Sequence, residues 1–203
     1  MMKKTPTELE KYLFDLNGYI KIKNAISKKE LDACNKIINN LKSLKNGEWN
    51  GYVHGHNYGG KEGLNLQQIY EAGKPFEKLI DHSSWINHML EFVGGKSTFD
   101  HQHGPLFIDE NFANIRGPGE AIGIHSGNPE GIQRNHYRYQ DGKFHCSQVN
   151  ILIALNDISP GDGGTIVIPS SHKSNIKHPE YKKNRMKKNG KVYVSLEEDL
   201  LFA

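Results

Sequence analysis

One segment, Val149–Asn175, constrains the fold of this chain more than any other part of the sequence. It begins with an apolar run rich in β-branched residues, Val149–Leu155, and continues into a turn at 159–164 that is rich in Gly, Pro and Asp. A second β-branched run, Thr165–Ile168, stops at Pro169. Because β-branched residues favour strands and glycine-rich stretches favour turns, the pattern predicts two strands with a tight connection. We expect the two runs to be neighbouring segments of one sheet.

Helix signals dominate the beginning of the chain. The sequence Thr5-Pro6-Thr7-Glu8 predicts a helix with Thr5 as its cap. This helix should run to about Leu16, and Asn17-Gly18 should end it. Residues Tyr19–Lys23 alternate between apolar and polar side chains and predict a strand. Ser27 and Glu30 form a second capping box, behind which apolar residues repeat at helical spacing. The chain therefore opens with a helix, a strand and a second helix.

The later segments indicate a mostly β fold. Residues 46–75 are rich in Gly, Asn, Tyr and His, which predicts long loops with a helical piece at 66–72. A helix over Pro75–Phe92, interrupted near Ser83-Ser84, is expected next. Short strands are expected at Phe107–Ile108, Phe112–Ile115 and Ala121–His125. Short strands behind N-terminal helices predict a double-stranded β-helix, the cupin-like jelly roll. The 203 residues fit one domain, 1–203.

Composition excludes several classes of protein. No apolar run approaches the roughly 20 residues of a spanning helix, and the start lacks the apolar core of a secretory signal. With two cysteines, a cytoplasmic location is expected and any metal site must use imidazole and oxygen ligands. The net charge is +3, but the basic run Lys182–Lys188 has no interleaved aromatic residues. We expect a small-molecule substrate and neither a nucleic-acid nor a membrane partner, and the oligomeric state stays open.

The segment Val149–Asn175 resembles the phytanoyl-CoA dioxygenase family of iron(II)- and 2-oxoglutarate-dependent oxygenases. In that family a strand, an acidic Gly-Gly turn, a strand and a Pro-Gly-Ser-His-Lys-like segment follow in this order. This chain has Ser170 where the family commonly has glycine. The resemblance implies a dioxygenase that hydroxylates a small organic substrate, with iron(II) and 2-oxoglutarate as cofactors.

The resemblance also implies a metal site. The family binds iron(II) with two histidines and one carboxylate, and the first histidine and the carboxylate lie in a His-x-Asp motif. The best match is His125, which follows a β-rich approach at Ile122–Ile124. His125 is therefore the candidate metal ligand. Position i+2 is Gly127, which has no ligand atom.

Three explanations of Gly127 stay open. Another oxygen ligand, from Glu130, Asp141 or water, completes the site. Alternatively, a halide occupies the vacancy, as in the iron(II)/2-oxoglutarate halogenases that this His-x-Gly resembles. In the third case the site binds no iron, and the protein is a non-catalytic, cupin-like barrel that binds small molecules.

Two further histidine pairs have the i, i+2 spacing of metal ligands. They are His54 with His56 and His101 with His103. Both pairs lie in stretches predicted as loops, and among 11 histidines such pairs arise by chance. We interpret both pairs as loop residues without a metal role.

The remaining candidates flank predicted strands. His136 and His145 border the connection Tyr137–Phe144 and are interpreted as surface residues. His172 and Lys173 belong to the family-like segment, where they are weak candidates for the substrate side of the site. The alternative, which we favour, is that His172 and Ser171 only cap the strand end and satisfy backbone groups.

The end of the sequence carries an expectation of its own. The family's second iron-binding histidine and the arginine for 2-oxoglutarate follow a Gly-Asp-x-x-x-Phe-like strand, and Val192–Ala203 resembles the approach to it. Neither residue can be assigned here. We expect a C-terminally truncated domain whose last strands are missing, and a fragment without both residues is expected to be inactive.

Overall fold

The protein is described by a computed structural model, which covers most but not all of the chain. The described residues are 5–59, 62–94, 102, 104–122, 125, 136–159, 162–174, 194–196 and 200–202. They divide into two compact units, one within Ile26–Ile86 and Phe107–Gly123, the other within Lys4–Ala25, Asn87–Leu106 and Ile124–Ala203. Each unit is described in turn.

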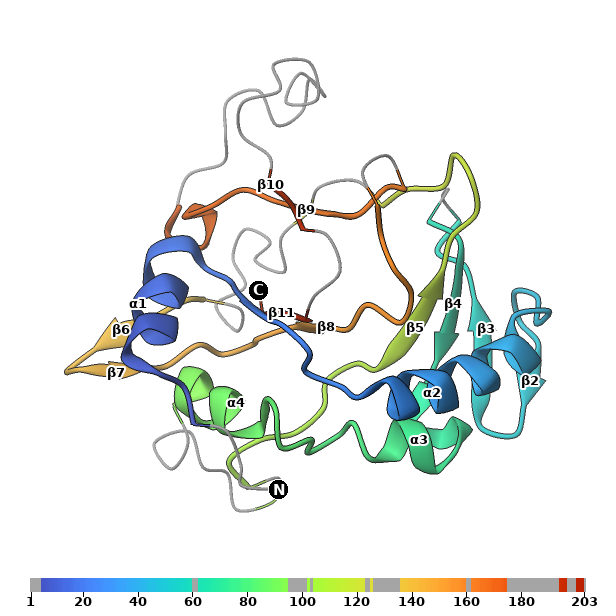
Figure 1. The fold of residues 1–203 in the computed structure, drawn as a ribbon, viewed down its shortest axis with the longest axis horizontal. Coiled ribbons are helices and arrows are strands. Elements are labelled where there is room, and N and C mark those ends of the chain that lie inside the picture. The colour runs from blue at the N-terminus through green and yellow to red at the C-terminus, as the bar shows by residue number, and fades with distance from the viewer. Residues whose placement is uncertain are drawn as a thin grey trace. The chain divides into compact units, whose positions relative to one another are not determined.

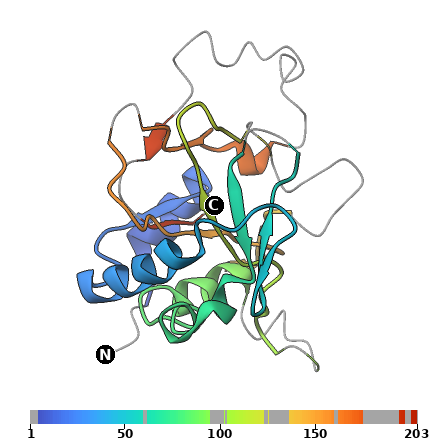
Figure 2. The ribbon, with the colours of Figure 1, turned by 90° about the vertical axis from the view of Figure 1, so that its right-hand side faces the viewer.

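The first unit contains a four-stranded antiparallel sheet in the order β2-β3-β4-β5 (Figures 1 and 2). Its elements are α2 (Lys28–Leu41), β2 (Trp49–Asn50), β3 (Val53–His56), β4 (Leu64–Gln67), the 3-10 helix η1 (Ile69–Ala72), α3 (Lys74–Glu77) and β5 (Phe112–Ile115). Helix α2 begins with the predicted capping box. The Ser27 hydroxyl accepts a hydrogen bond from the Glu30 backbone, and the Glu30 carboxylate accepts one from the Ser27 backbone at 2.8 Å.

The two faces of this sheet have different chemistry. Val53 and Leu66 are buried, and Val53 borders the same cavity as Leu41 of α2. His54 and His56 alternate with Val53 along β3 and therefore point to the opposite face. The sheet thus has one apolar face toward α2 and one face that carries histidines.

Gly55 separates the two histidines for a steric reason. A Cβ atom at Gly55 would overlap with the backbone carbonyl of Lys45, in the segment that follows α2. Only glycine leaves room for this close approach. The His-Gly-His sequence therefore reflects chain packing on one face of β3 and two rings on the other.

The second unit contains three small antiparallel sheets. Their orders are β1-β11-β8, β10-β9 and β6-β7. The elements are α1 (Glu8–Asn17), β1 (Ile20–Ile22), α4 (Ile86–Val93), β6 (Tyr139–Gln140), β7 (Lys143–Phe144), β8 (Ile151–Leu152), β9 (Thr165–Val167), the 3-10 helix η3 (Ser171–Lys173), β10 (Val194–Leu196) and β11 (Leu200–Phe202).

Three phenylalanine rings form the centre of this unit, and we call them the phenylalanine stack: Phe14, Phe92 and Phe144. All three are buried. The rings of Phe14 and Phe92 are stacked with centroids 3.8 Å apart, and Phe144 packs edge-on against both. Large aromatic side chains bury much apolar area, so the stack joins α1, α4 and β7 into one core.

Helices α1, α2 and α4 form where the sequence predicted helices, but α1 begins later than expected and α3 ends at Glu77, well before the predicted interruption near Ser83. The cap of α1 is Thr7, and the capping box pairs Thr7 with Glu10. The predicted cap at Thr5 is wrong because the reciprocal Thr7–Glu10 pair satisfies two backbone donors at once. Pro6 lies before the cap and is buried. The helix expected over Pro75–Phe92 is interrupted as predicted, but the interruption extends over residues 78–85 and not only near Ser83.

The predicted loops at 46–75 are wrong. This segment contains β2, β3 and β4, and of the helical piece expected at 66–72 only Ile69–Ala72 is helical. These strands have two to four residues and polar side chains on one face, so they show no clear apolar alternation.

The strand prediction at Phe112–Ile115 is confirmed as β5, whereas Phe107–Ile108 is not a strand. Of the strand expected at Ala121–His125, residues 121 and 122 are not in a strand, and residues 123 and 124 lie outside the described residues.

The most constraining segment forms strands where predicted, but their pairing differs. Both β8 and β9 lie in the two β-branched runs. However, β8 pairs with β11, and β9 pairs with β10. The expectation that the two runs neighbour each other in one sheet is therefore wrong for the described residues. Composition predicts a strand, but it does not specify a partner that lies far along the chain.

The broader expectation of N-terminal helices followed by short strands is confirmed. Among the described helices, none combines the length and apolar character needed to cross a membrane.

Candidate functional site

The predicted metal ligand, His125, has an exposed side chain. Asp141 is also exposed, in the turn between β6 and β7, while Gly127, Glu130, His101 and His103 lie outside the described residues. Within the described part of the chain, no three His, Cys, Asp or Glu side chains gather into a group that could hold a metal. The described residues therefore do not form an iron site by themselves.

His54 and His56 lie in a strand and not in the loop that the sequence predicted. They belong to four rings that we call the ring row: Trp49, His54, His56 and Tyr58. Neighbouring ring centroids are 4.5, 5.6 and 4.4 Å apart along this order. His54 and His56 therefore have aromatic neighbours, whereas the iron site of an oxygenase contains a carboxylate ligand.

The family-like segment packs against the end of α1 through four side chains, which we call the Asp15 cluster: Asp15, Tyr137, His172 and Lys173. The Tyr137 hydroxyl donates a hydrogen bond to the Asp15 carboxylate. The Lys173 ammonium lies 3.2 Å from the same carboxylate and 5.6 Å from the centroid of the Tyr137 ring. The cluster therefore joins α1, η3 and the segment that leads into β6.

Backbone groups of α1 take part in the same contact. His172 Nε2 lies 3.0 Å from the Asp15 carbonyl oxygen, and the Ser170 hydroxyl donates to the Leu16 carbonyl at 2.7 Å. The Ser170 backbone N–H donates to the Asn17 carbonyl at 2.9 Å. These bonds satisfy carbonyls at the end of a helix, which lack partners within the helix. His172 therefore lies at a carbonyl of the last turn of α1 and not at the strand end that the sequence predicted it to cap.

The contacts of Ser170 explain how serine is accommodated at a position where the family commonly has glycine. Its φ is 66°, a left-handed conformation that glycine adopts without strain. The Ser170 hydroxyl donates to the Leu16 carbonyl, and this bond offsets part of the strain. Gly18, at the end of α1, has a φ of 84°, and a Cβ there would overlap with the His172 ring. Both positions serve the close fit between α1 and η3.

The electrostatics of the Asp15 cluster favour fixed protonation states. Burial, followed by the hydrogen bond to Asp15, raises the pKa of Tyr137 well above its usual range. The same hydrogen bond, followed by Lys173, lowers the pKa of Asp15, and burial lowers the pKa of His172. At neutral pH the hydroxyl therefore donates to an ionised carboxylate beside a neutral imidazole. These groups hold the segment after β9 in place, and a substrate-side role of His172 and Lys173 stays a prediction.

The other two histidines lie beside the β6–β7 hairpin, which occupies the connection predicted at Tyr137–Phe144. Both His136 and His145 are half-buried. The backbone N–H of His145 donates to the Arg138 carbonyl at 2.8 Å. Their backbones thus extend the hairpin.

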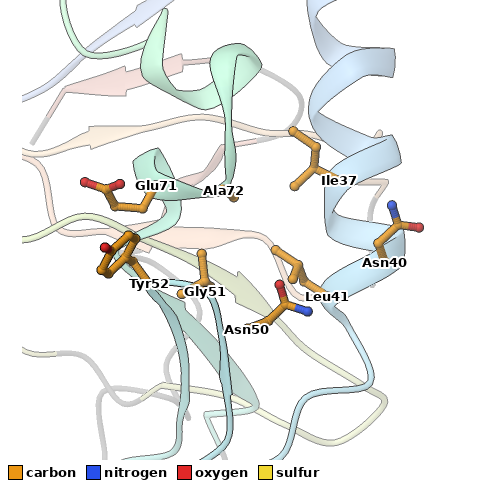
Figure 3. A pocket seen from close by; sticks show the side chains of 9 residues that line it. Ile37, Asn40, Leu41, Asn50, Gly51, Tyr52, Glu71 and Ala72 are labelled. Atoms are coloured by element: carbon orange, nitrogen blue, oxygen red, sulfur yellow. The ribbon is translucent and has the colours of Figure 1, made fainter.

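A cavity of about 410 Å³ lies within the first unit, between α2, the β2–β3 turn and η1 (Figure 3). Its polar lining comes from Asn40, Asn50, Tyr52 and Glu71, and the described residues that line it include no histidine.

Asp15 and Tyr137 belong to the Asp15 cluster, but no sequence pattern marked either residue as a candidate. Asp15 and Tyr137 are 122 positions apart, and nothing local to either residue marks the contact. The available signals were indirect: Asp15 is an acidic residue in the last turn of α1, where a helix ordinarily favours positive charge. Such an acid needs a cation or a donor nearby, and Tyr137 and Lys173 provide both.

Comparison with known protein families decides what kind of protein this is. The family model described as phytanoyl-CoA dioxygenase (PhyH) matches residues 14–198. The chain belongs to the phytanoyl-CoA dioxygenase family. This confirms the resemblance seen in the sequence, and iron(II) and 2-oxoglutarate are the cofactors of such oxygenases. No curated protein matches the sequence significantly.

Solved structures of HygX from Streptomyces hygroscopicus share the fold. The complex with nickel, 2-oxoglutarate and hygromycin B has a TM-score of 0.76 at 20% identity, over 97% of this chain and 77% of that one. The iron-bound form has a TM-score of 0.72 at 19% identity, over 98% of this chain and 76% of that one. At this level of identity the similarity establishes the fold alone.

Proposed function

We propose that this protein is an iron(II)- and 2-oxoglutarate-dependent dioxygenase that hydroxylates a small organic substrate. The observation that carries the proposal is the family match over residues 14–198. The HygX structures support it, because they contain iron or nickel, 2-oxoglutarate and the small molecule hygromycin B. We further propose a single domain with a double-stranded β-helix, located in the cytoplasm.

His125 is our proposed iron ligand. Imidazole is a ligand that iron(II) accepts, and His125 precedes the strands of the family-like segment as the family's first histidine does. Bound iron(II) with 2-oxoglutarate would supply the oxidation of a C–H bond. The described residues position the segment after β9, because the Asp15 cluster holds this segment against α1. In our proposal this contact fixes one wall of the substrate pocket, and His172 and Lys173 belong to that wall.

A second candidate function is halogenation, and Gly127 is the observation that favours it. Glycine at the carboxylate position of His-x-Asp leaves a coordination position for chloride or bromide. Product masses from assays with and without halide separate the two reactions. In a halogenase, Gly127→Asp should abolish halogenation, because the new carboxylate takes the position of the halide. In a hydroxylase whose oxygen ligand comes from elsewhere, the same change should lower activity without any dependence on halide.

The direct test of the proposal is the iron-dependent conversion of 2-oxoglutarate to succinate, followed by mass spectrometry. The protein should be expressed from its complete reading frame, with any residues that follow Ala203. We expect succinate only when iron(II) and oxygen are both present, and a chelator should abolish it. If the protein forms no succinate and binds no iron, the non-catalytic barrel is the correct interpretation.

A further inference from the structure

Two imidazole rings converge on one face of β3. His54 and His56 are two residues apart on this strand, so their side chains point to the same face of the sheet. Such residues are separated by about 6.8 Å along a strand. The centroids of the two rings are only 5.6 Å apart, with an angle of 40° between the ring planes, so the rings lean toward each other. The interpretation of this pair as loop residues without a metal role does not hold for a strand.

The separation of the two rings suits a shared metal ion. A metal ion about 2.1 Å from an imidazole nitrogen lies roughly 3.2 Å from the centroid of that ring. Two centroids 5.6 Å apart can both lie at this distance from one ion, and the angle between them at the ion is then roughly 120°. This angle is compatible with the near-tetrahedral coordination of zinc. One ion can therefore be bound by both rings without any movement of β3.

Both rings have nitrogen atoms available for such an ion. Among the described residues, no group makes a hydrogen bond or an ion pair with either imidazole. The side chains of His54 and His56 are half-buried, and none of their ring nitrogens is closed off from solvent. A neutral imidazole has one nitrogen with a lone pair that can bind a metal. Each ring of the pair therefore presents such a nitrogen to an ion that enters from solvent.

Neighbouring aromatic rings hold the two imidazoles in position. The Trp49 ring stacks on His54 with an interplanar angle of 21°, which covers a face of the imidazole and leaves its edge, with the nitrogens, open. The Tyr58 ring packs against His56 at 85°. The Tyr58 hydroxyl donates a hydrogen bond to Glu110 at 2.8 Å, so it is engaged elsewhere and does not compete for an imidazole nitrogen.

The backbone beneath the pair is fixed on both sides. Strand β3 lies between β2 and β4 in the sheet (Figure 1). Gly55, between the two histidines, donates its N–H to the Glu48 carbonyl at 2.9 Å and accepts from the Gly47 N–H at 2.8 Å. Along its other edge β3 pairs with β4, with Gly55 opposite Leu66. Ligands on a rigid element lose little conformational freedom when a metal binds, so the strand favours binding.

We propose that His54 and His56 bind one divalent transition-metal ion of the class that accepts imidazole ligands: zinc, nickel or copper. Within the described part of the chain no third His, Cys, Asp or Glu joins the pair, so water completes the coordination. In the general order of affinities iron(II) binds more weakly than nickel(II) or copper(II), and magnesium prefers oxygen ligands. The site does not include His125, so it goes beyond the proposed oxygenase activity.

The test follows the fluorescence of Trp49 while nickel(II) is added to the whole protein, without iron or 2-oxoglutarate. Nickel(II) at the pair lies close to the indole that stacks on His54 and quenches its emission. Zinc(II) has a filled d shell and does not quench. We expect saturable quenching by nickel(II), none by magnesium, and recovery of the emission when excess zinc(II) displaces nickel(II).

The decisive variants are His54→Phe and His56→Phe, because each keeps an aromatic ring in the ring row and removes the ligand nitrogens. Each should weaken nickel(II) binding on the order of 10-fold or more, since the site loses one of its two protein ligands. His125→Ala is the matched control and should leave the quenching unchanged. Circular dichroism should show that all three variants are folded.

A further variant, Trp49→Phe, identifies the reporter. It leaves Trp85, which is buried, as the remaining tryptophan, and its emission should not respond to nickel(II). The proposal is overturned if nickel(II) does not quench the wild type, if both histidine variants bind nickel(II) as the wild type does, or if Trp49→Phe is quenched equally. It is also overturned if His125→Ala abolishes the quenching, because the ion then belongs to the proposed iron site.

Discussion

Each unit of the molecule contains a group of aromatic rings in mutual contact, and the two groups differ in exposure. In the phenylalanine stack of the second unit, Phe92 is fully buried and its ring lies 3.8 Å from that of Phe14. In the ring row of the first unit, Trp49 lies 4.5 Å from His54 but is 59% exposed. Ring contacts of similar geometry therefore serve two purposes. Buried rings stabilise the fold, while exposed rings remain available to a ligand.

The largest expected effect concerns the phenylalanine stack. Phe92→Ala removes a ring that touches Phe14 and Phe144, and the resulting cavity should lower the free energy of unfolding by about 3–5 kcal/mol. Urea denaturation measures the change. Trp49→Ala is the control and should stay within about 0.5 kcal/mol of the wild type, because its ring is mostly exposed. Equal losses in the two variants would refute the distinction between the two ring groups.

The two buried cysteines allow each unit to be followed separately. Cys34 lies in α2 of the first unit, and Cys146 follows β7 of the second, where burial raises its pKa to about 11. Both thiols should react slowly with a disulfide reagent in the folded protein. In Phe92→Ala, Cys146 should react on the order of 100-fold faster, since labelling reports local opening. The rate at Cys34 should change much less, and a parallel increase would show that the units open together.

A smaller effect is expected at the Asp15 cluster. Tyr137→Phe removes the hydroxyl that donates to Asp15, which should cost about 1 kcal/mol in stability. Because that hydrogen bond is the largest cause of the lowered pKa of Asp15, the pKa should rise toward its ordinary value. NMR titration of the carboxyl group measures the shift. An unchanged Asp15 pKa would mean that Lys173 alone sets the charge state.

The dependence of stability on pH should show the same cluster. Burial lowers the pKa of His172 below its ordinary value of 6.5, so the folded protein binds fewer protons here than the unfolded chain. The stabilisation is fully present above pH 6.5 and is lost as the pH falls below that value. Asp15, whose pKa is also lowered, adds a loss in the same direction at more acidic pH.

Thermal unfolding across this pH range checks the expectation. His172→Gln can keep a donor for the Asp15 carbonyl but cannot take up a proton, so its stability should vary less between pH 7 and pH 5 than that of the wild type. His125→Gln changes an exposed side chain and serves as the control. Parallel curves for wild type and His172→Gln would contradict the assignment.

Local signals in the sequence predicted local structure. The capping box at Ser27 and the end of α1 at Asn17-Gly18 agree with the sequence predictions, because both signals act over a few residues. The strands around His54 were missed because they are short and polar on one face. The pairing of β8 with β11 and the contact of Asp15 with Tyr137 depend on residues far apart, which no local pattern specifies.

In the family-like segment, the local sequence predicted some features, and contacts with distant residues determine the others. Its composition predicted the strands and the family, and its Ser-His-Lys sequence suggested contact with substrate or a cap. The structure adds that these side chains contact the last turn of α1, which explains why position 170 favours glycine.

The most direct test of the proposed function is the iron(II) affinity of the protein expressed from its complete reading frame, measured anaerobically by calorimetry. The proposal predicts that His125→Ala weakens iron(II) binding on the order of 10–100-fold, as is typical when a metal site is perturbed. His54→Ala, which changes a histidine of the ring row, should leave the affinity unchanged. Iron(II) binding that His125→Ala leaves intact, or that both variants weaken equally, would contradict the assignment of His125 as the metal ligand.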